Sequence, residues 1–284
     1  MKLFVTGYAG QLGYDVVQEG LKQGFEIHGS GRDQLDITNE QAVYEYVNQI
    51  NPDVIIHCAA YTAVDKAEDN KEACWDVNVN GTRYLAAAAK QVQAKFMYIS
   101  TDYVFDGSGK EPFTETDPTN PVGYYGLTKL EGEKRVQELL NEAFIIRISW
   151  VFGSNGNNFI KTMLRLSETH KELKVVGDQY GSPTYTYDLA KLLLEIVQTN
   201  KYGTYHASNE GFCTWSDFAK EIFKQADKQI SVESIPTAEY PTRAVRPLNS
   251  RMSKAKLEDQ GFQRLPSWQD ALTHYLEQLN KEVR

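Results

Sequence analysis

The chain has 284 residues, of which 41% are hydrophobic and 24% are charged, and its formal net charge is −8. These values are ordinary for a globular protein, and the length suffices for one large α/β domain or a main domain with a smaller lobe. The acidic balance without a basic stripe argues against a nucleic-acid partner, and no apolar run approaches the roughly 18 residues of a membrane span.

The cysteines and the N-terminus bear on the cellular setting. Cys58, Cys74 and Cys213 are odd in number and far apart, and no C-x-x-C pair or Cys/His cluster is present. The N-terminal segment MKLFVTGYAG is broken by glycines, unlike a signal peptide. We therefore expect a cytoplasmic protein with reduced thiols that hold no metal.

Strands and helices alternate through the first two-thirds of the chain. Short apolar runs predict strands at 2–6, 25–29, 53–59, 95–100 and 144–149. Apolar residues at helical spacing predict helices at 11–23, 39–50, 71–92 and 122–140. Thr38 is a plausible N-cap of the second helix. Strands without alternating polarity that are separated by helices indicate a Rossmann-type α/β fold, in which a doubly wound parallel sheet is covered on both faces.

After about residue 150 the pattern loosens. It predicts helices at 158–169, 186–198, 215–226 and 267–281, and a strand at 204–207. We expect a dinucleotide-binding domain at 1–150, to which about 185–207 returns. The segments at about 151–184 and 208–284 would form a smaller C-terminal substrate-binding lobe.

A glycine-rich turn, Gly7-x-x-Gly10-x-x-Gly13, directly follows the first predicted strand and opens a helix. The first glycine allows a tight turn, the second lets a phosphate approach the backbone, and the third permits close packing of helix on strand. Amides at the helix N-terminus, around Gln11 and Leu12, would then face a pyrophosphate. The alternative is that these glycines only form a turn and bind no ligand. The position of the motif at the first strand-to-helix junction favours a dinucleotide site.

The end of the second strand bears on the choice of cofactor. It reads Gly29-Ser30-Gly31-Arg32, without an acidic residue for a ribose 2′-hydroxyl. Arg32 could hold the 2′-phosphate of NADP or be a solvated surface arginine. Asp36 and Ile37 could contact the adenine, although Asp36 could equally be a turn residue. We favour NADPH, with NADH as the alternative, and include Ser30 in the cofactor site.

Tyr125 and Lys129 are four residues apart and so lie one turn from each other on the same face of a predicted helix. We expect the lysine ammonium to lower the pKa of the phenol toward working pH, so that Tyr125 can donate a proton to a carbonyl oxygen. A second hydroxyl, Thr101, ends the preceding strand. The motif Y-x-x-x-K alone is weak evidence for a site. However, residues 6–7, 59–61, 100–102 and 149–150 all fall at the carboxyl ends of predicted strands, where parallel sheets bind their ligands.

With these features in order, the chain resembles the extended short-chain dehydrogenase/reductases. Longer strings are similar to the dTDP-4-dehydrorhamnose reductase family, namely CAAYTAVDKAE, STDYVFDG, YYGLTKLEGE, RISWVFG, NNFIKTMLRL, DQYGSPT and RPLNSRM. They run from Gly7 past Arg251 and cover nearly the whole chain. The resemblance implies NAD(P)H-dependent reduction of the C4 ketone of dTDP-4-dehydro-6-deoxy-L-mannose to dTDP-L-rhamnose, an activated sugar of cell-wall and O-antigen polysaccharides.

The resemblance also implies residue roles. Tyr125 would be the proton donor, Lys129 the pKa modulator and ribose binder, and Thr101 a hydrogen-bond donor to the carbonyl oxygen. The nicotinamide side of the cofactor would meet Ala59, Ala60 and Tyr61. The substrate contacts would be Val64, Thr101, Asp102, Tyr103, Trp150, Asn158 and Arg246. Trp150 could instead pack between the lobes, and Asp102 could cap its loop.

Some members of this family use magnesium at a dimer contact formed by glutamates. The N-terminal glutamate position reads Asp15 here, which we interpret as a solvated helix residue. Neither the metal dependence nor that dimer is therefore carried over, and we predict no metal ligand. The expected partner is a small-molecule nucleotide sugar, and the chain would be a monomer or a homodimer.

Three alternatives stay open. The first is another nucleotide-sugar enzyme of the same superfamily, such as an epimerase, a 4,6-dehydratase or an epimerase/reductase. A dehydratase usually carries an Asp–Glu pair after its Ser or Thr, whereas Asp102-Tyr103 follows Thr101 here. The second is a reductase that makes a different deoxysugar. The third is a noncatalytic NADP-binding regulatory subunit, against which the intact Thr101, Tyr125 and Lys129 argue.

Overall fold

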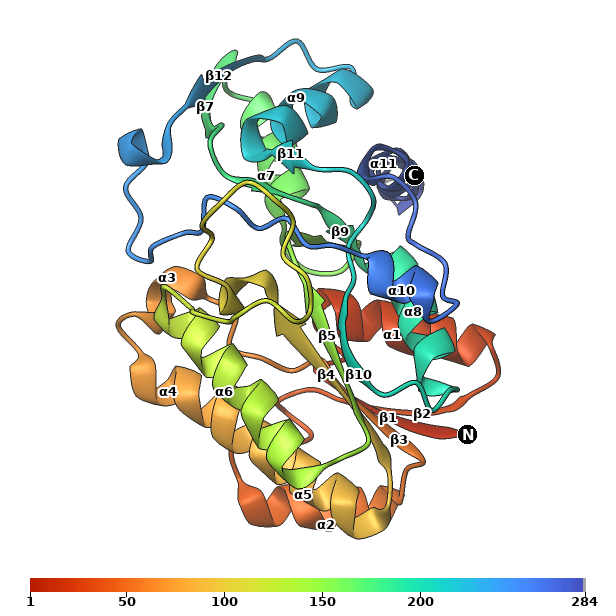
Figure 1. Ribbon diagram of the computed structural model, residues 1–284. Helices are drawn as coiled ribbons and strands as arrows, with labels where there is room; N and C mark the ends of the chain where they lie inside the picture. Colours follow the sequence, from red (N-terminus) through yellow and green to blue (C-terminus); the bar gives the residue numbers. More distant parts are fainter. Residues whose placement is uncertain (283–284) are drawn as a thin grey trace.

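A six-stranded parallel sheet with the strand order β10-β5-β4-β3-β1-β2 forms the centre of the larger lobe (Figure 1). The computed structural model describes residues 1–282. The strands are β1 (Lys2–Thr6), β2 (Glu26–Ser30), β3 (Val54–His57), β4 (Lys95–Thr101), β5 (Ala143–Ile148) and β10 (Gly203–His206). The doubly wound α/β fold predicted from the sequence is confirmed.

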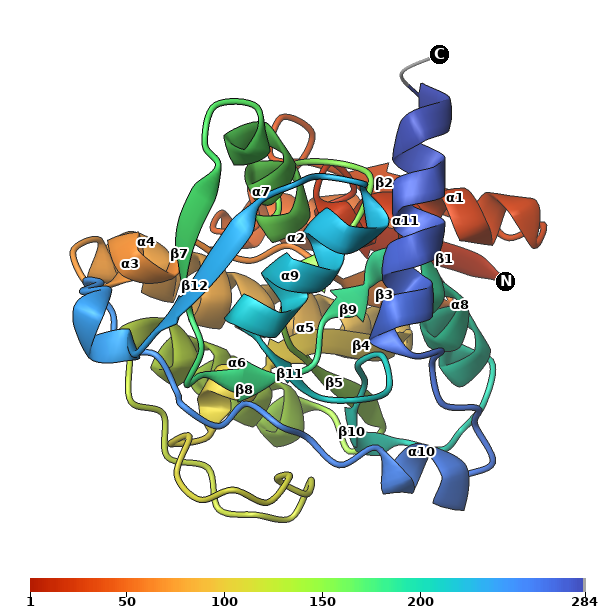
Figure 2. The same ribbon diagram turned by 90° about the horizontal axis from the view of Figure 1, so that it is seen from above.

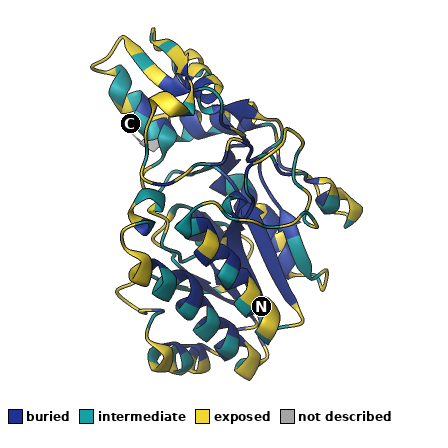
Figure 3. Ribbon diagram, turned by 60° about the vertical axis from the view of Figure 1, so that its left-hand side comes forward, coloured by how far each residue is buried: buried dark blue, intermediate teal, exposed yellow. Residues whose placement is uncertain are grey.

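Helices cover both faces of this sheet, which explains why its strands are apolar throughout. On one face α1 (Gln11–Lys22) and α8 (Thr186–Val197) pack over side chains such as Leu3 and Val5. On the other face α2 (Glu40–Ile50), α5 (Thr82–Val92) and α6 (Tyr124–Leu139) pack over Phe4 and Ile55. Successive strand residues point to opposite faces, so each strand serves both cores. Figure 3 shows the strands buried and the outer helix faces exposed.

Two predicted helices differ in detail from the structure. The helix predicted at 71–92 consists of α4 (Lys71–Trp75), a π-helical turn η1 (Asp76–Gly81) and α5. The N-cap of α2 is Asn39, whose side chain accepts a hydrogen bond from the Ala42 amide. The prediction of Thr38 as the cap is wrong, because the Thr38 hydroxyl donates to Asp36 instead.

The smaller lobe is built from α7 (Phe159–Ser167), α9 (Trp215–Gln225) and α11 (Trp268–Glu282), which lie together in the view from above (Figure 2). Three two-stranded pairs complete it: β7 (Glu172–Val176) with β12 (Ser231–Ile235), β8 (Tyr180–Gly181) with β11 (Cys213–Thr214), and β6 (Val151–Phe152) with β9 (Thr184–Tyr185). Its core is aromatic and includes Phe152, Phe218, Trp268 and Tyr275. Four short elements join the rest: α3 (Val64–Ala67), η2 (Asp102–Val104), η3 (Thr237–Glu239) and α10 (Ala255–Asp259).

The segment around α10 departs from the expected division of the chain. Leu257, Phe262 and Leu265 pack in the core of the sheet, beside α8, although the sequence placed 208–284 in the lobe. Apolar side chains at the β10 edge of the sheet need cover, and this segment supplies it. We therefore propose the expected two-part division with about 255–265 reassigned to the larger part.

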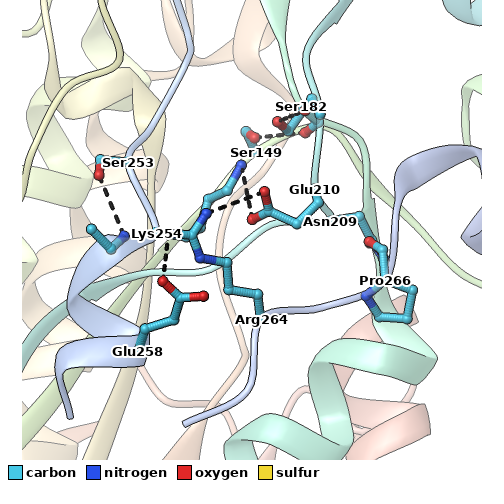
Figure 4. Close-up of polar contacts among 11 residues, drawn as sticks. Ser149, Ser182, Asn209, Glu210, Ser253, Lys254, Glu258, Arg264 and Pro266 are labelled. Carbon is cyan, nitrogen blue, oxygen red and sulfur yellow. Dashed lines mark hydrogen bonds and ion pairs between the residues drawn. The ribbon is translucent and has the colours of Figure 1, made fainter. Parts of the chain in front are cut away.

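Ion pairs fix this reassigned segment to the chain that follows β10 (Figure 4). The buried Lys254 ammonium lies 3.6 Å from Glu210, and Arg264 bridges Glu210 at 3.4 Å and Glu258 at 2.8 Å. Such linked charges hold the α10 segment in register with the sheet edge.

Candidate active site

A cleft of about 810 Å³ opens at the carboxyl ends of the strands and is closed on its far side by residues of the smaller lobe. The structure brings together there all the residues predicted for the cofactor: Gly7, Gly10, Gln11, Leu12, Gly13, Ser30, Arg32, Asp36, Ile37, Ala59, Ala60, Tyr61, Tyr125 and Lys129. Five predicted substrate residues also line it: Val64, Thr101, Asp102, Tyr103 and Trp150. Asn158 and Arg246 lie outside the lining.

The glycine loop fits a dinucleotide diphosphate. Gly7 has a φ of +69°, and a Cβ there would come within 2.8 Å of the Ala59 backbone. A Cβ on Gly13 would lie 2.3 Å from the Gly7 carbonyl oxygen. Gly10 is the N-cap of α1, and no side chain caps the amides that follow it. Unsatisfied amides at a helix start that line a cleft suit a phosphate.

The end of β2 presents a cation and an anion to the cleft. Asp36 accepts hydrogen bonds from the amide and hydroxyl of Thr38, which lower its pKa, and Arg32 adds to this effect. Arg32 itself is exposed on the cleft. The Ser30 carbonyl accepts a 2.8 Å hydrogen bond from the Gly7 amide, so this strand end and the glycine loop are fixed to each other.

A buried asparagine, which the sequence analysis missed, holds the end of β3. Asn78 lies on the π-helical turn; its side-chain oxygen accepts from the Tyr61 amide at 2.8 Å, and its nitrogen donates to the Tyr61 carbonyl at 3.2 Å. The same nitrogen donates to Thr128 on α6 at 3.0 Å. A polar residue in the otherwise apolar pattern of this helix is the signal that could have pointed to it.

Thr101, Tyr125 and Lys129 converge on the cleft from β4 and α6. The Thr101 hydroxyl donates to Asp102 at 2.9 Å and accepts from the Tyr103 amide at 3.2 Å. Burial raises the pKa of Tyr125 well above its ordinary value, the Asp102 charge adds to this, and a hydrogen bond with Thr101 opposes it. The expected net lowering of the Tyr125 pKa is therefore wrong for this structure, because burial and the Asp102 charge outweigh the opposing hydrogen bond with Thr101.

Lys129 is also shifted by burial, which lowers its pKa to about 7, while the Glu133 carboxylate works in the opposite direction. Its ammonium nitrogen lies 4.1 Å from the centroid of the Tyr98 ring. One turn further along α6, Glu133 accepts two hydrogen bonds from Arg147, at 2.9 and 2.7 Å, and one from Ser100. These buried bonds anchor α6 to β4 and β5.

Asp102 and Tyr103, directly after Thr101, also line the cleft. Burial raises the pKa of Asp102 to about 6, and hydrogen bonds with Ser250 and Thr101 oppose the rise. Arg246 lies behind this wall: it pairs with Asp65 at 2.6 Å and donates to the Tyr103 hydroxyl at 3.3 Å. Arg246 thus reaches the cleft through Tyr103 and is not part of its lining.

Asn158 lies outside the cleft lining and is held by hydrogen bonds of its own. Its side-chain oxygen accepts from the Lys161 amide at 3.0 Å, as the N-cap of α7, and its nitrogen donates to the Gly153 carbonyl at 2.9 Å and the Tyr275 hydroxyl at 3.0 Å. The same nitrogen also donates to the Gln11 side-chain oxygen at 3.2 Å, so the amide is bonded both inside the lobe and to the start of α1. An asparagine directly before an apolar helix is the usual sequence signal for such a cap.

Asp15 is buried, so its interpretation as a solvated residue is wrong. It accepts a hydrogen bond from the hydroxyl of Thr186, because α1 packs directly against α8. Within residues 1–282, no three His, Cys, Asp or Glu side chains gather so that they could hold a metal ion. In the same described part of the chain, no helix is long and apolar enough to cross a membrane.

Two tryptophans form the lobe's side of the cleft. Trp150 follows β5 with a φ of +47°, a left-handed conformation that costs a bulky residue on the order of 1–3 kcal/mol. Its ring stacks on that of Trp215, with the centroids 3.8 Å apart. Trp215 lines the cleft but was missed, since nothing in the sequence places it beside a residue 65 positions earlier.

Comparisons with known proteins agree along nearly the full length. A family model described as the RmlD substrate binding domain matches residues 1–281. A dTDP-4-dehydrorhamnose reductase of Aggregatibacter actinomycetemcomitans is 42% identical over 285 residues, with 95% of this chain and 97% of that protein covered.

Two solved structures are similar in both fold and sequence. A dTDP-4-dehydrorhamnose reductase from Clostridium acetobutylicum has a TM-score of 0.97 and 43% identity, with 99% of this chain and 100% of that chain covered. One from Bacillus anthracis, in complex with NADP, has a TM-score of 0.95 and 42% identity, with 98% and 99% covered.

Proposed function

This chain belongs to the dTDP-4-dehydrorhamnose reductase family, and from that premise we propose that it uses NAD(P)H to reduce the C4 ketone of dTDP-4-dehydro-6-deoxy-L-mannose, giving dTDP-L-rhamnose. The observation that carries the proposal is the single cleft. It holds the glycine loop at one end, Thr101, Tyr125 and Lys129 in its middle, and Asp102, Tyr103 and Trp150 at the other end.

NAD(P)H, when bound, supplies the hydride for the C4 carbon. Tyr125 donates the proton to the C4 oxygen, and its raised pKa keeps the phenol protonated until charge develops there. Transfer is then favourable, since an alkoxide is a stronger base than a phenoxide. The Thr101 hydroxyl, whose proton goes to Asp102 in the structure, would turn with substrate bound to donate to the same oxygen and stabilise the developing charge. Lys129 binds the ribose hydroxyls on the nicotinamide side and, when protonated, adds positive charge beside Tyr125.

We favour NADPH over NADH as the cofactor. The exposed Arg32 at the end of β2 provides the positive charge that a 2′-phosphate requires, and the similar Bacillus anthracis enzyme was solved with NADP. Asp36 is held by Thr38 in an orientation that suits an adenosine hydroxyl or amine.

Val64, Asp102, Tyr103 and Trp150 would contact the nucleotide sugar, with Arg246 acting through Tyr103. A monomer or a homodimer in the cytoplasm is part of the same proposal. The three cysteines are free thiols, as suits a reducing compartment.

The direct test follows NADPH oxidation with dTDP-4-dehydro-6-deoxy-L-mannose and identifies the product by NMR spectroscopy. Tyr125→Phe should lower kcat by about 10²- to 10⁴-fold and leave the Kd for NADPH nearly unchanged, because only the proton is lost. Tyr124→Phe is the matched control, since Tyr124 lies outside the cleft lining. Absence of oxidation with both NADPH and NADH would remove the reductase proposal, and a different sugar product would redirect it to a related enzyme.

A further inference from the structure

Trp215 has no part in the mechanism above, yet it lines the cleft from the first residue of α9. Its backbone is fixed by a capping box. The Thr214 hydroxyl accepts from the Asp217 amide at 3.1 Å, and the Asp217 carboxylate accepts from the Thr214 amide at 3.1 Å. Phe159 packs behind the indole, with the ring centroids 4.7 Å apart. Trp215 is therefore a rigid surface rather than a loose side chain.

The indole of Trp215 stacks on that of Trp150, whose backbone has the left-handed conformation that bulky residues disfavour. The two indoles are nearly parallel, at 14°, with a centroid distance of 3.8 Å. A bulky residue at a positive φ persists only where its surroundings over-determine it. The stack on Trp215 is one such contact.

The second contact is Gly181. A Cβ at this position would lie 2.7 to 3.0 Å from three atoms of the Trp150 indole. Any residue larger than glycine would therefore displace the ring. Gly181 pairs with Cys213 in the β8–β11 ladder, and β11 ends at Thr214, directly before Trp215. One strand pair thus positions both supports of Trp150.

We propose that Trp215 is a positioning residue for the sugar: it holds Trp150 as the wall of the substrate end and does so together with the space left by Gly181. This inference rests on the proposed function and adds to it a residue 65 positions from Trp150. Because the cofactor end is formed by other elements, Trp215 should affect sugar recognition and leave NADPH binding unchanged.

A double-mutant cycle tests this with the full-length enzyme, in which Trp150→Ala, Trp215→Ala and the double variant are compared with the wild type. Trp215→Ala should raise KM for the keto sugar by about fivefold to tenfold. In the Trp150→Ala background the same change should add less than about twofold, since the two residues act as one unit. Trp215→Phe should restore most of the affinity, and Gly181→Ala should reproduce the defect.

The Kd for NADPH and the Tm of each variant separate positioning from misfolding. An equal effect of Trp215→Ala in both backgrounds, or a parallel loss of NADPH binding, would overturn the inference while leaving the proposed function intact. Lack of wild-type turnover with the keto sugar would overturn the proposed function, and this inference with it.

Discussion

At the scale of single residues, burial dominates the chemistry of the cleft. It raises the pKa of Tyr125 and lowers that of Lys129 to about 7, although the two side chains come from adjacent turns of one helix. The Tyr125 phenol is thereby held neutral, and the Lys129 side chain can gain or lose its charge near neutral pH. Neither effect follows from the four-residue spacing, which reports only that the side chains share a face.

The Lys129 pKa predicts a pH dependence of stability. Between about pH 7 and its ordinary value of 10.5, the unfolded chain binds a proton on Lys129 that the folded protein has released, so stability rises with pH in this window. Below pH 7 both states are protonated, and the folded protein bears the full cost of the buried ammonium. Lys129→Met removes this cost and should therefore raise the free energy of unfolding at pH 7. At pH 9 the increase should be smaller by about 2 kcal/mol, because the wild-type lysine is then largely neutral.

Urea unfolding at each pH measures this difference. Lys134→Met, an exposed position on the same helix, should change stability equally at both pH values. A constant difference for Lys129→Met would show that its ammonium is not destabilised in the folded protein.

Arg32 carries a second residue-scale prediction, for cofactor choice. Arg32→Ser should raise KM for NADPH by about tenfold or more and change KM for NADH little, because only NADPH brings a 2′-phosphate to the cleft. Steady-state kinetics with both cofactors measure this, and Arg135→Ser, on the outer side of α6, serves as the control. An equal rise for both cofactors would place Arg32 elsewhere in the site.

At the scale of elements, α6, which carries Tyr125 and Lys129, is held by polar contacts on the side that faces its neighbours. Glu133 joins it to β4 and β5, and Thr128 joins it to the π-helical turn through Asn78. The turn matters because it bulges the chain where Asn78 must reach the Tyr61 backbone. The orientation of α6 is therefore set by its polar contacts with β4, β5 and the π-helical turn rather than by its own weak amphipathicity.

Removal of the Glu133 charge should be costly. Glu133→Gln leaves the Arg147 guanidinium buried without its counter-charge, and we expect a loss of about 3–5 kcal/mol in unfolding free energy. Glu138→Gln breaks a surface pair of the same 2.7 Å length and should cost less than about 1 kcal/mol. Chemical denaturation distinguishes the two, and similar losses would contradict the assigned importance of burial.

Features that depend on local sequence could be predicted, whereas features that depend on contacts between distant residues could not. Strand β1 and the start of α1 were predicted with the residues that the structure assigns, because local apolar pattern and glycine punctuation determine them. The π-helical turn could not be predicted, since its residues keep a helical pattern. Strands β7 and β12 were missed because their polar alternating residues become strands only by pairing with each other. The stacking of Trp150 on Trp215 is likewise a product of tertiary structure.

At the scale of the whole molecule, the glycine loop is bonded to the smaller lobe. The side-chain amide of Asn155 donates to the Ala9 carbonyl at 2.7 Å. The side-chain oxygen of Gln11 accepts from the backbone amide of Gly153 at 2.9 Å. The loop at 153–158 thus rests on the turn that would hold the diphosphate. We therefore expect binding of the cofactor to be coupled to placement of the lobe.

This coupling predicts where NADPH slows hydrogen exchange. At about 100 times its Kd, NADPH should stabilise the fold by roughly 2.7 kcal/mol and protect amides in both the glycine loop and 153–158. Asn155→Ala should retain the protection of the glycine loop and reduce that of 153–158, as measured by mass spectrometry. Asn157→Ala, an exposed neighbour, should change neither. Unaltered protection of 153–158 in Asn155→Ala would show that the lobe loop responds without this bond.

The order of the strands has a consequence for how such an enzyme can evolve. The chain leaves the sheet after β5, builds the first part of the lobe, and returns to add α8 and β10 before it leaves again. Residues 1–150 alone would therefore lack α8, one of the two helices that cover Leu3 and Val5. Because the smaller lobe comes from separate segments, exchange of one contiguous stretch of sequence would not replace it. We therefore expect changes of substrate to arise inside this interleaved chain, by point changes and loop insertions at the cleft.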